Sequence, residues 1–177
     1  MTATPHSPEH HDSHHDPDAN AVDLQGLQAL PDDRLVEHIL TRYHDTHRRQ
    51  LPKLIRLSQR VERVHGGHPA CPAGLSDHLE TLQDELDMHM QKEERILFPM
   101  ILRGATGMAV APVQVMRQEH DEHGDALERL LALTNRLTPP EDACGSWQRL
   151  YSGLATLVAD LKEHIEIENS VLFQRVG

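Results

Sequence analysis

The sequence predicts an all-α protein, an up-down-up-down four-helix bundle preceded by a disordered, histidine-rich N-terminal tail. Apolar side chains recur every three or four residues over four long stretches, which is the spacing of one helix face. Short segments containing glycine or proline separate these stretches, and short connections make neighbouring helices antiparallel. At 177 residues, the chain is long enough for one domain with a substantial core.

The composition excludes several classes of function. The formal net charge of -11 argues against binding to nucleic acid or to an anionic membrane surface. No apolar run approaches the roughly 20 residues that span a bilayer. The polar N-terminus is not a secretory signal, so we expect a cytoplasmic protein. Cys71 and Cys144 match neither a zinc spacing nor a disulfide framework, so we expect ordinary reduced thiols.

Residues 1–22 are predicted to be the disordered tail. They carry five of the 15 histidines, among proline, aspartate and serine, and show no helical periodicity. A loose contact with metal ions is an alternative role for this tail, but its histidines are not counted as a site.

The bundle is predicted to cover residues 32–177. A short amphipathic turn at 24–30 precedes it, and the first long helix starts at Pro31-Asp32-Asp33, where acidic charge suits a helix N-terminus. This helix runs to about Val64 and passes through Pro52, which predicts a kink rather than a reversal. A segment rich in glycine and proline then ends it.

Three further helices follow in the same way. They are predicted at about 74–103, 111–137 and from 141 or 146 to 175, with glycine or proline at the breaks. Aromatic residues make up only 3% of the chain, so aliphatic side chains must form the core. The predicted core positions include Leu51, Leu54, Leu79, Leu82, Leu130, Leu154 and Leu157.

Two histidine–glutamate pairs indicate a metal site. His89 and Glu93 are four residues apart, as are His164 and Glu168, so each pair lies on one helix face, one turn apart. Imidazole nitrogen together with carboxylate oxygen suits iron, manganese or zinc. A bundle whose facing helices supply inward histidines and carboxylates is a known way to hold two metals.

An antiparallel bundle also sets a geometric test for this site. Counting from the end where the first helix starts, His44 and His120 lie about 12 and 9 residues deep, and His89 and His164 about 14 and 11. At about 1.5 Å per residue, these depths agree to within roughly 8 Å. We therefore expect one histidine per helix at one level, with both glutamates bridging two metals. The predicted ligands are His44, His89, Glu93, His120, His164 and Glu168.

Several neighbouring side chains are weighed against this set. His47 and His123 each follow a predicted ligand by three residues, and hydrogen bonding to a ligand is favoured over ligation. Glu119 and Glu85 either orient a ligand ring, line a path for ions or lie on a solvated face.

The far end of the bundle is excluded from this site. His65 lies 21 residues beyond His44, which is roughly 31 Å along a helix. His68, Cys71 and Cys144 fall in the loops at the same far end, where a second, adventitious metal site is an alternative.

With these residues in place, the chain resembles the hemerythrin-like proteins, and most of all the C-terminal domain of the di-iron proteins that repair iron centres. The resemblance covers about 32–177 and implies the same six ligands around two non-haem iron ions joined by an oxo bridge. In that group, a domain with a cysteine pair precedes the bundle, where this sequence has its histidine-rich tail. The segments that carry the resemblance are ILTRYHDTHRRQLPKLI at 39–55, VERVHG at 61–66, HMQKEERILFPMI at 89–101, VMRQEHDEHG at 115–124 and LKEHIEIENSVLF at 161–173.

The resemblance implies a function in the response to nitrosative and oxidative stress. The expected role is to repair damaged iron–sulfur clusters or to supply them with iron, so the expected partners are iron, O2 or NO, and damaged iron–sulfur proteins. A hemerythrin-like protein that binds or senses O2 or NO without turnover is the alternative. An oxidoreductase acting on NO or peroxide is a third possibility, and whether the chain is an enzyme stays open.

Overall fold

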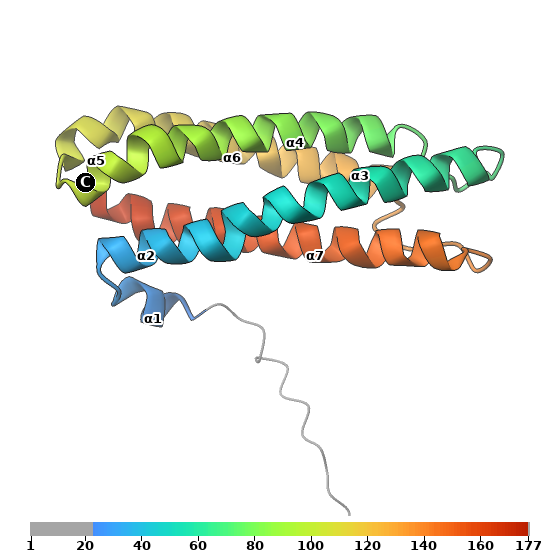
Figure 1. The fold of residues 1–177 in the computed structure, drawn as a ribbon, viewed down its shortest axis with the longest axis horizontal. Helices are drawn as coiled ribbons and strands as arrows, with labels where there is room; N and C mark the ends of the chain where they lie inside the picture. Colours follow the sequence, from blue (N-terminus) through green and yellow to red (C-terminus); the bar gives the residue numbers. More distant parts are fainter. Residues whose placement is uncertain (1–22, 177) are drawn as a thin grey trace, which may run out of the picture.

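The computed structural model describes residues 23–176, all of whose regular elements are helical. The predicted tail at 1–22 lies outside these described residues. Four rods run side by side in alternating directions, which confirms the four-helix bundle (Figure 1). The elements are α1 Leu24–Gln28, α2 Asp32–Ile39, η1 Leu40–His44, α3 Asp45–His65, α4 Leu75–Lys92, η2 Glu93–Leu97, α5 Phe98–Leu102, α6 Thr106–Leu133, α7 Gly145–Ile167, η3 Glu168–Leu172 and η4 Phe173–Val176.

Three of the four rods are made of several elements in succession. The first combines α2, η1 and α3, the second α4, η2 and α5, and the fourth α7, η3 and η4, while α6 alone forms the third. The helix continues through Pro52 without reversing direction. Within residues 23–176, no helix is both long and apolar enough to cross a membrane.

The third helix differs from its predicted bounds at both ends. It begins at Thr106 rather than 111, because Gly104, with a φ of 71°, already turns the chain after the second rod. It ends at Leu133 rather than 137, because Asn135, Arg136 and Leu137 all have positive φ values. A left-handed backbone cannot continue a right-handed helix.

The C-terminus fastens the short first helix to the bundle. The Arg175 guanidinium donates to the carbonyl oxygens of Leu27, Gln28 and Leu30 and pairs with Asp32 at 2.7 Å. These bonds satisfy carbonyl groups at and just beyond the C-terminal end of α1, where helical N–H partners run out. The predicted turn before the bundle is therefore a real element, held across the fold.

The apolar core consists of two clusters with a polar layer between them. In every rod, one cluster lies before the polar layer and the other after it, except that Met90 and Ile167 fall between two polar residues of the layer. The large cluster includes Leu51, Leu79, Leu127 and Leu154, and the small cluster includes Leu35, Leu97, Val113 and Leu172. The buried polar side chains of the layer between them are His44, His47, His89, Glu93, His120, His123, His164 and Glu168.

Replacing Leu79 by alanine should lower the free energy of unfolding by about 2–5 kcal/mol, because it empties a fully buried position. The control Val64→Ala, at a side chain that is 63% exposed, should change it by less than about 0.5 kcal/mol. Urea denaturation of the chelator-treated protein, followed by circular dichroism, measures both. Equal effects would contradict the assignment of Leu79 to the large cluster.

Candidate metal centre

Three π-helical turns position half of the predicted ligands. His44 is the last residue of η1, Glu93 is the first of η2, and Glu168 is the first of η3. A π turn holds one extra residue, so it rotates the side chains beyond it by roughly 100° around the helix axis. The other three ligands, His89, His120 and His164, project from regular α-helix. The apolar spacing of the sequence does not predict these π turns.

The six predicted ligand residues converge in the polar layer and are at most 3% exposed. Within the described chain, both oxygens of Glu93, both oxygens of Glu168 and Nε2 of His44 and His164 have no hydrogen-bond partner. Burying polar atoms without partners is costly. A set of facing, unsatisfied nitrogen and oxygen atoms is the donor set that a transition metal requires, so these residues fit metal ions.

The ligand atoms fall into two groups that share the glutamates. One group is His44, Glu93, His164 and Glu168, and the other is His89, Glu93, His120 and Glu168. In each group, the candidate donor atoms all lie within 4.8 Å of one another. Each group therefore offers two imidazole nitrogens and two carboxylate oxygens.

The carboxylates are oriented to face both groups at once. Glu93 turns Oε2 toward His44 Nε2 at 3.4 Å and Oε1 toward His89 Nε2 at 3.3 Å. Glu168 turns Oε1 toward His164 Nε2 and Oε2 toward His120 Nε2, each at 3.1 Å. Donors bonded to one metal at about 2.0–2.2 Å lie roughly 3–3.5 Å apart, so these spacings suit a bound ion.

Three of the four histidines are held from behind by a hydrogen bond at Nδ1. The partners are Glu94 for His44 at 2.8 Å, Glu119 for His89 at 2.9 Å, and the Asn169 side-chain oxygen for His120 at 3.1 Å. Such bonds fix the ring orientation and direct Nε2 inward. Basic side chains hold these partners in turn: Arg48 contacts Glu94, Lys92 contacts Glu119, and Arg117 contacts Asn169.

These outer residues were only partly anticipated from the sequence. Glu119 was considered as a group that orients a ring, and it does so, whereas Glu85 is exposed to solvent. Glu94 and Asn169 were missed. Both directly follow a predicted ligand glutamate, and a residue one step further along a helix points about 100° away, toward the neighbouring helix. That adjacency is the signal that identifies them.

His164 lacks this support. No atom of residues 23–176 hydrogen-bonds its Nδ1. Its ring is instead stacked against Tyr43, with centroids 5.4 Å apart, and against His47 at 5.3 Å. Ring contacts restrict its position but do not select the nitrogen that faces the metal.

His47 and His123 lie beside the two groups without joining either. The prediction that His47 and His123 hydrogen-bond to ligands is wrong. Each contacts a ligand ring only through a ring face or edge. Burial, together with the nearby charges of His164 and His44, lowers the pKa of His47 to about 3, despite an opposing effect of Gln50. Burial and the charges of His89 and His120 likewise lower the pKa of His123 to about 3.

The far end of the bundle holds no comparable group among the described residues. His65 Nε2 lies 3.1 Å from Cys144 Sγ, and its ring packs on Trp147. His68 pairs with Asp142 at 3.3 Å. The alternative of a second metal site there gains no support.

Comparison with known proteins identifies the family. The hemerythrin HHE cation binding domain matches residues 35–176 of this chain. The chain belongs to this family. It is 51% identical over 148 residues to the iron-sulfur cluster repair protein YtfE of Cronobacter sakazakii, covering 84% of this chain and 67% of that protein.

Further relatives carry the same description. The iron-sulfur cluster repair protein YtfE of Dickeya chrysanthemi is 50% identical over 141 residues, covering 80% of this chain and 64% of the relative. The Escherichia coli O1:K1 protein is 49% identical over 148 residues, covering 84% and 67%. The chain thus spans about two thirds of the length of these curated relatives. The predicted similarity of this chain to the proteins that repair iron–sulfur clusters is confirmed.

Removing the carboxylate behind His44 should weaken metal binding. We expect Glu94→Ala to lower metal affinity about 10–100-fold, because the His44 ring loses the bond that orients it. The control Glu85→Ala removes an exposed carboxylate of the same rod and should leave affinity unchanged. Competition with a chromogenic chelator measures both. Wild-type affinity in Glu94→Ala would show that this bond does not orient a ligand.

Metal affinity should also fall as the solution becomes more acidic. Burial alone lowers the pKa of His89, but Glu93, Glu168 and Glu119 outweigh it and raise the pKa to about 9. In the metal-free protein, His89 therefore holds a proton below that pH, and a metal ion must displace it. Affinity should rise by about tenfold per pH unit for this proton and level off above about pH 9. Calorimetric titration in several buffers measures affinity and proton release, and a pH-independent affinity would contradict the expectation.

Proposed function

We propose that the six buried residues bind two iron ions. His44 and His164 would hold one ion, His89 and His120 the other, and Glu93 and Glu168 would bridge them. The shared carboxylates are the observation that supports this assignment, since each turns one oxygen toward each group. The oxo bridge implied by the family resemblance stays a prediction. We also retain residues 32–177 as the proposed bounds of the di-iron domain.

We further propose that the protein repairs damaged iron–sulfur clusters by supplying iron. This function is supported by the sequence identity of 50–51% to curated iron–sulfur cluster repair proteins over most of this chain. The donor set is consistent with it, because four protein donors per ion are fewer than the six of an octahedral site. An ion held by few ligands, two of them shared carboxylates, exchanges more readily than a fully enclosed one. Damaged iron–sulfur proteins are thus the proposed partners.

Reversible binding or sensing of O2 or NO is a second candidate. The same low number of protein donors favours it, since each ion retains positions for a small ligand. Here the chain's own residues would fix the ions firmly and exclude bulk water from the buried layer. The two functions differ in whether iron leaves the protein.

The purified protein should hold about two irons per chain. Glu93→Leu and Glu168→Leu should each lose most of this iron, because each carboxylate serves both groups. The control His65→Ala should retain it, since His65 belongs to neither group. Metal analysis measures the content, and circular dichroism confirms that the variants fold. Iron content near that of the wild type in either glutamate variant would contradict the bridging assignment.

Anaerobic mixing of the iron-loaded protein with an apo iron–sulfur protein tests the function itself. Cluster repair predicts that iron passes to the acceptor, whose cluster absorbance returns when sulfide and reductant are present. Glu168→Leu, which lacks the iron, is the matched control. A reversible spectral change with O2 or NO, without transfer, would favour the second candidate instead.

A further inference from the structure

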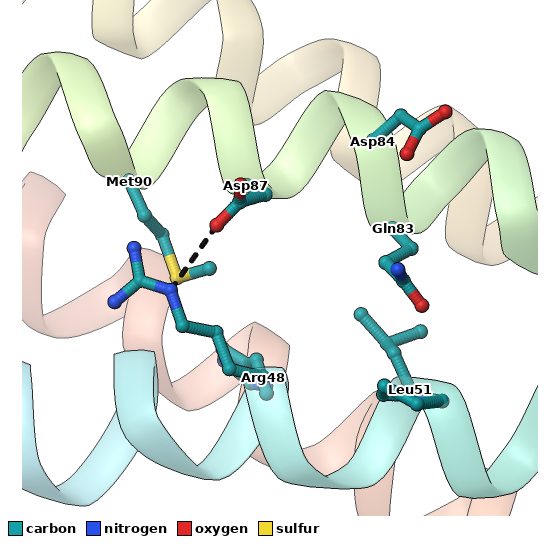
Figure 2. Close-up of a pocket in the computed structure, with 8 residues that line it drawn as sticks. Arg48, Leu51, Gln83, Asp84, Asp87 and Met90 are labelled. Carbon is teal, nitrogen blue, oxygen red and sulfur yellow. Dashed lines mark hydrogen bonds and ion pairs between the residues drawn. The ribbon is translucent and has the colours of Figure 1, made fainter.

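A cavity of about 250 Å³ lies between α3 and α4, on the side of the first metal group. Figure 2 shows Arg48 and Leu51 on α3 facing Gln83, Asp87 and Met90 on α4 across it. The lining is mixed, since apolar Leu51 and Met90 lie beside polar and charged side chains. Because liquid water occupies about 30 Å³ per molecule, the cavity has room for an ion with several of its waters.

Two polar groups of this cavity have no partner within the described chain. His47 is fully buried and lines the cavity, yet neither of its ring nitrogens makes a hydrogen bond. Gln83 Oε1, on the opposite wall, is likewise buried and unpaired. Gln50 is near His47, but its amide donates to Asp160 at 2.8 Å and its oxygen is also unpaired. Unpaired donors and acceptors that line one cavity indicate a polar ligand.

The cavity reaches the first metal group by two routes. The His47 ring is stacked on the His164 ring at 5.3 Å, with 29° between the ring planes. Arg48 connects the wall to the other histidine of that group, because it donates to Glu94 at 2.7 Å and Glu94 accepts from His44 Nδ1. The cavity wall therefore contacts His164 directly, through His47, and reaches His44 only through Glu94.

This group is also the less firmly anchored of the two. In the second group, both histidines have a hydrogen bond at Nδ1, whereas in the first His164 has none. Loss of one outer hydrogen bond of this kind commonly lowers metal affinity about 10–100-fold. The ion of the first group should thus exchange faster than the ion of the second.

We propose that this cavity is the path by which iron reaches and leaves the centre, with His47 as a transit ligand for the ion of the first group. The inference rests on the proposed iron-supplying function and names its route. In transit, ferrous iron would exchange its bond to His164 Nε2 for a bond to a His47 ring nitrogen, and water would replace its bonds to His44, Glu93 and Glu168. No electron is transferred, and water completes the coordination of the ion.

The charges of the cavity suit transit rather than tight binding. Asp87 supplies a carboxylate at the wall, and Arg48 neutralises much of its charge through a 3.1 Å contact (Figure 2). Arg48 pairs with Glu94 as well, at 2.7 Å. Two unpaired carboxylates would bind a divalent ion tightly. Asp87, which is already paired with Arg48, attracts the ion weakly, so the ion can move on.

Stopped-flow release of iron to a ferrous chelator tests the path. The wild type, loaded anaerobically with iron, should release it in two phases, the faster from the first group. His47→Leu should slow the faster phase and the uptake of iron by the same factor, about tenfold, which corresponds to about 1.4 kcal/mol in each barrier. Equal changes in both directions leave the equilibrium affinity and the iron content unchanged, which distinguishes a transit ligand from a structural ligand. His123→Leu is the matched control, because His123 is also a buried histidine beside a ligand ring, that of His89, but it does not line the cavity.

Asp87→Asn provides a second variant if His47→Leu does not fold. It leaves the Arg48 charge less neutralised at the wall, so it should slow uptake without altering the spectrum of the bound iron. The proposal is wrong if His47→Leu lowers affinity rather than both rates, if His123→Leu slows transfer equally, or if Asp87→Asn takes up iron as fast as the wild type. A wild type that holds no iron, or that never supplies an acceptor protein, would instead refute the proposed function.

Discussion

The constraint that organises this bundle is a layer of buried polar side chains whose hydrogen-bonding atoms are mostly not satisfied by one another. Four carboxylate oxygens and several ring nitrogens meet in the middle of an aliphatic bundle, and most have no hydrogen-bond partner within residues 23–176. Two apolar clusters, above and below this layer, supply the burial that keeps the four rods together. The candidate metal ligands thus lie between two apolar clusters whose burial does not require a metal. A metal ion resolves the unfavourable layer, and the clusters hold the layer in place.

Residues outside the polar layer fix the orientation of three of its histidine rings. Glu94, Glu119 and Asn169 each lie next to a predicted ligand in the sequence, yet each bonds a histidine from another rod. Arg48, Lys92 and Arg117 then bind these three residues from the surface side. Every rod is therefore tied to another through a ligand ring. Binding of metal and packing of the bundle are coupled through these bonds.

The two halves of the centre are similar in their donors but not in their surroundings. Each has two histidines and the two shared glutamates, so the inner chemistry is symmetrical. Around the first group, one histidine lacks an outer bond, and a polar cavity begins at His47. This asymmetry supports the proposed supply of iron, in which one ion would move while the other would keep the site assembled.

The sequence alone determined the four rods and the six converging residues. The spacing of apolar residues and the glycine and proline breaks define the rods. Because helical rise per residue is nearly constant, equal depth in an antiparallel bundle selects one histidine from each rod. Only the tertiary structure decided the rest. The bonds to Glu94 and Asn169 and the ring contacts of His47 join neighbouring rods. The π turns at His44, Glu93 and Glu168 are local, but the apolar spacing does not reveal them. The sequence offers one partial signal, since Glu94 and Asn169 each directly follow a ligand glutamate, but it does not show which histidine of another rod each one bonds.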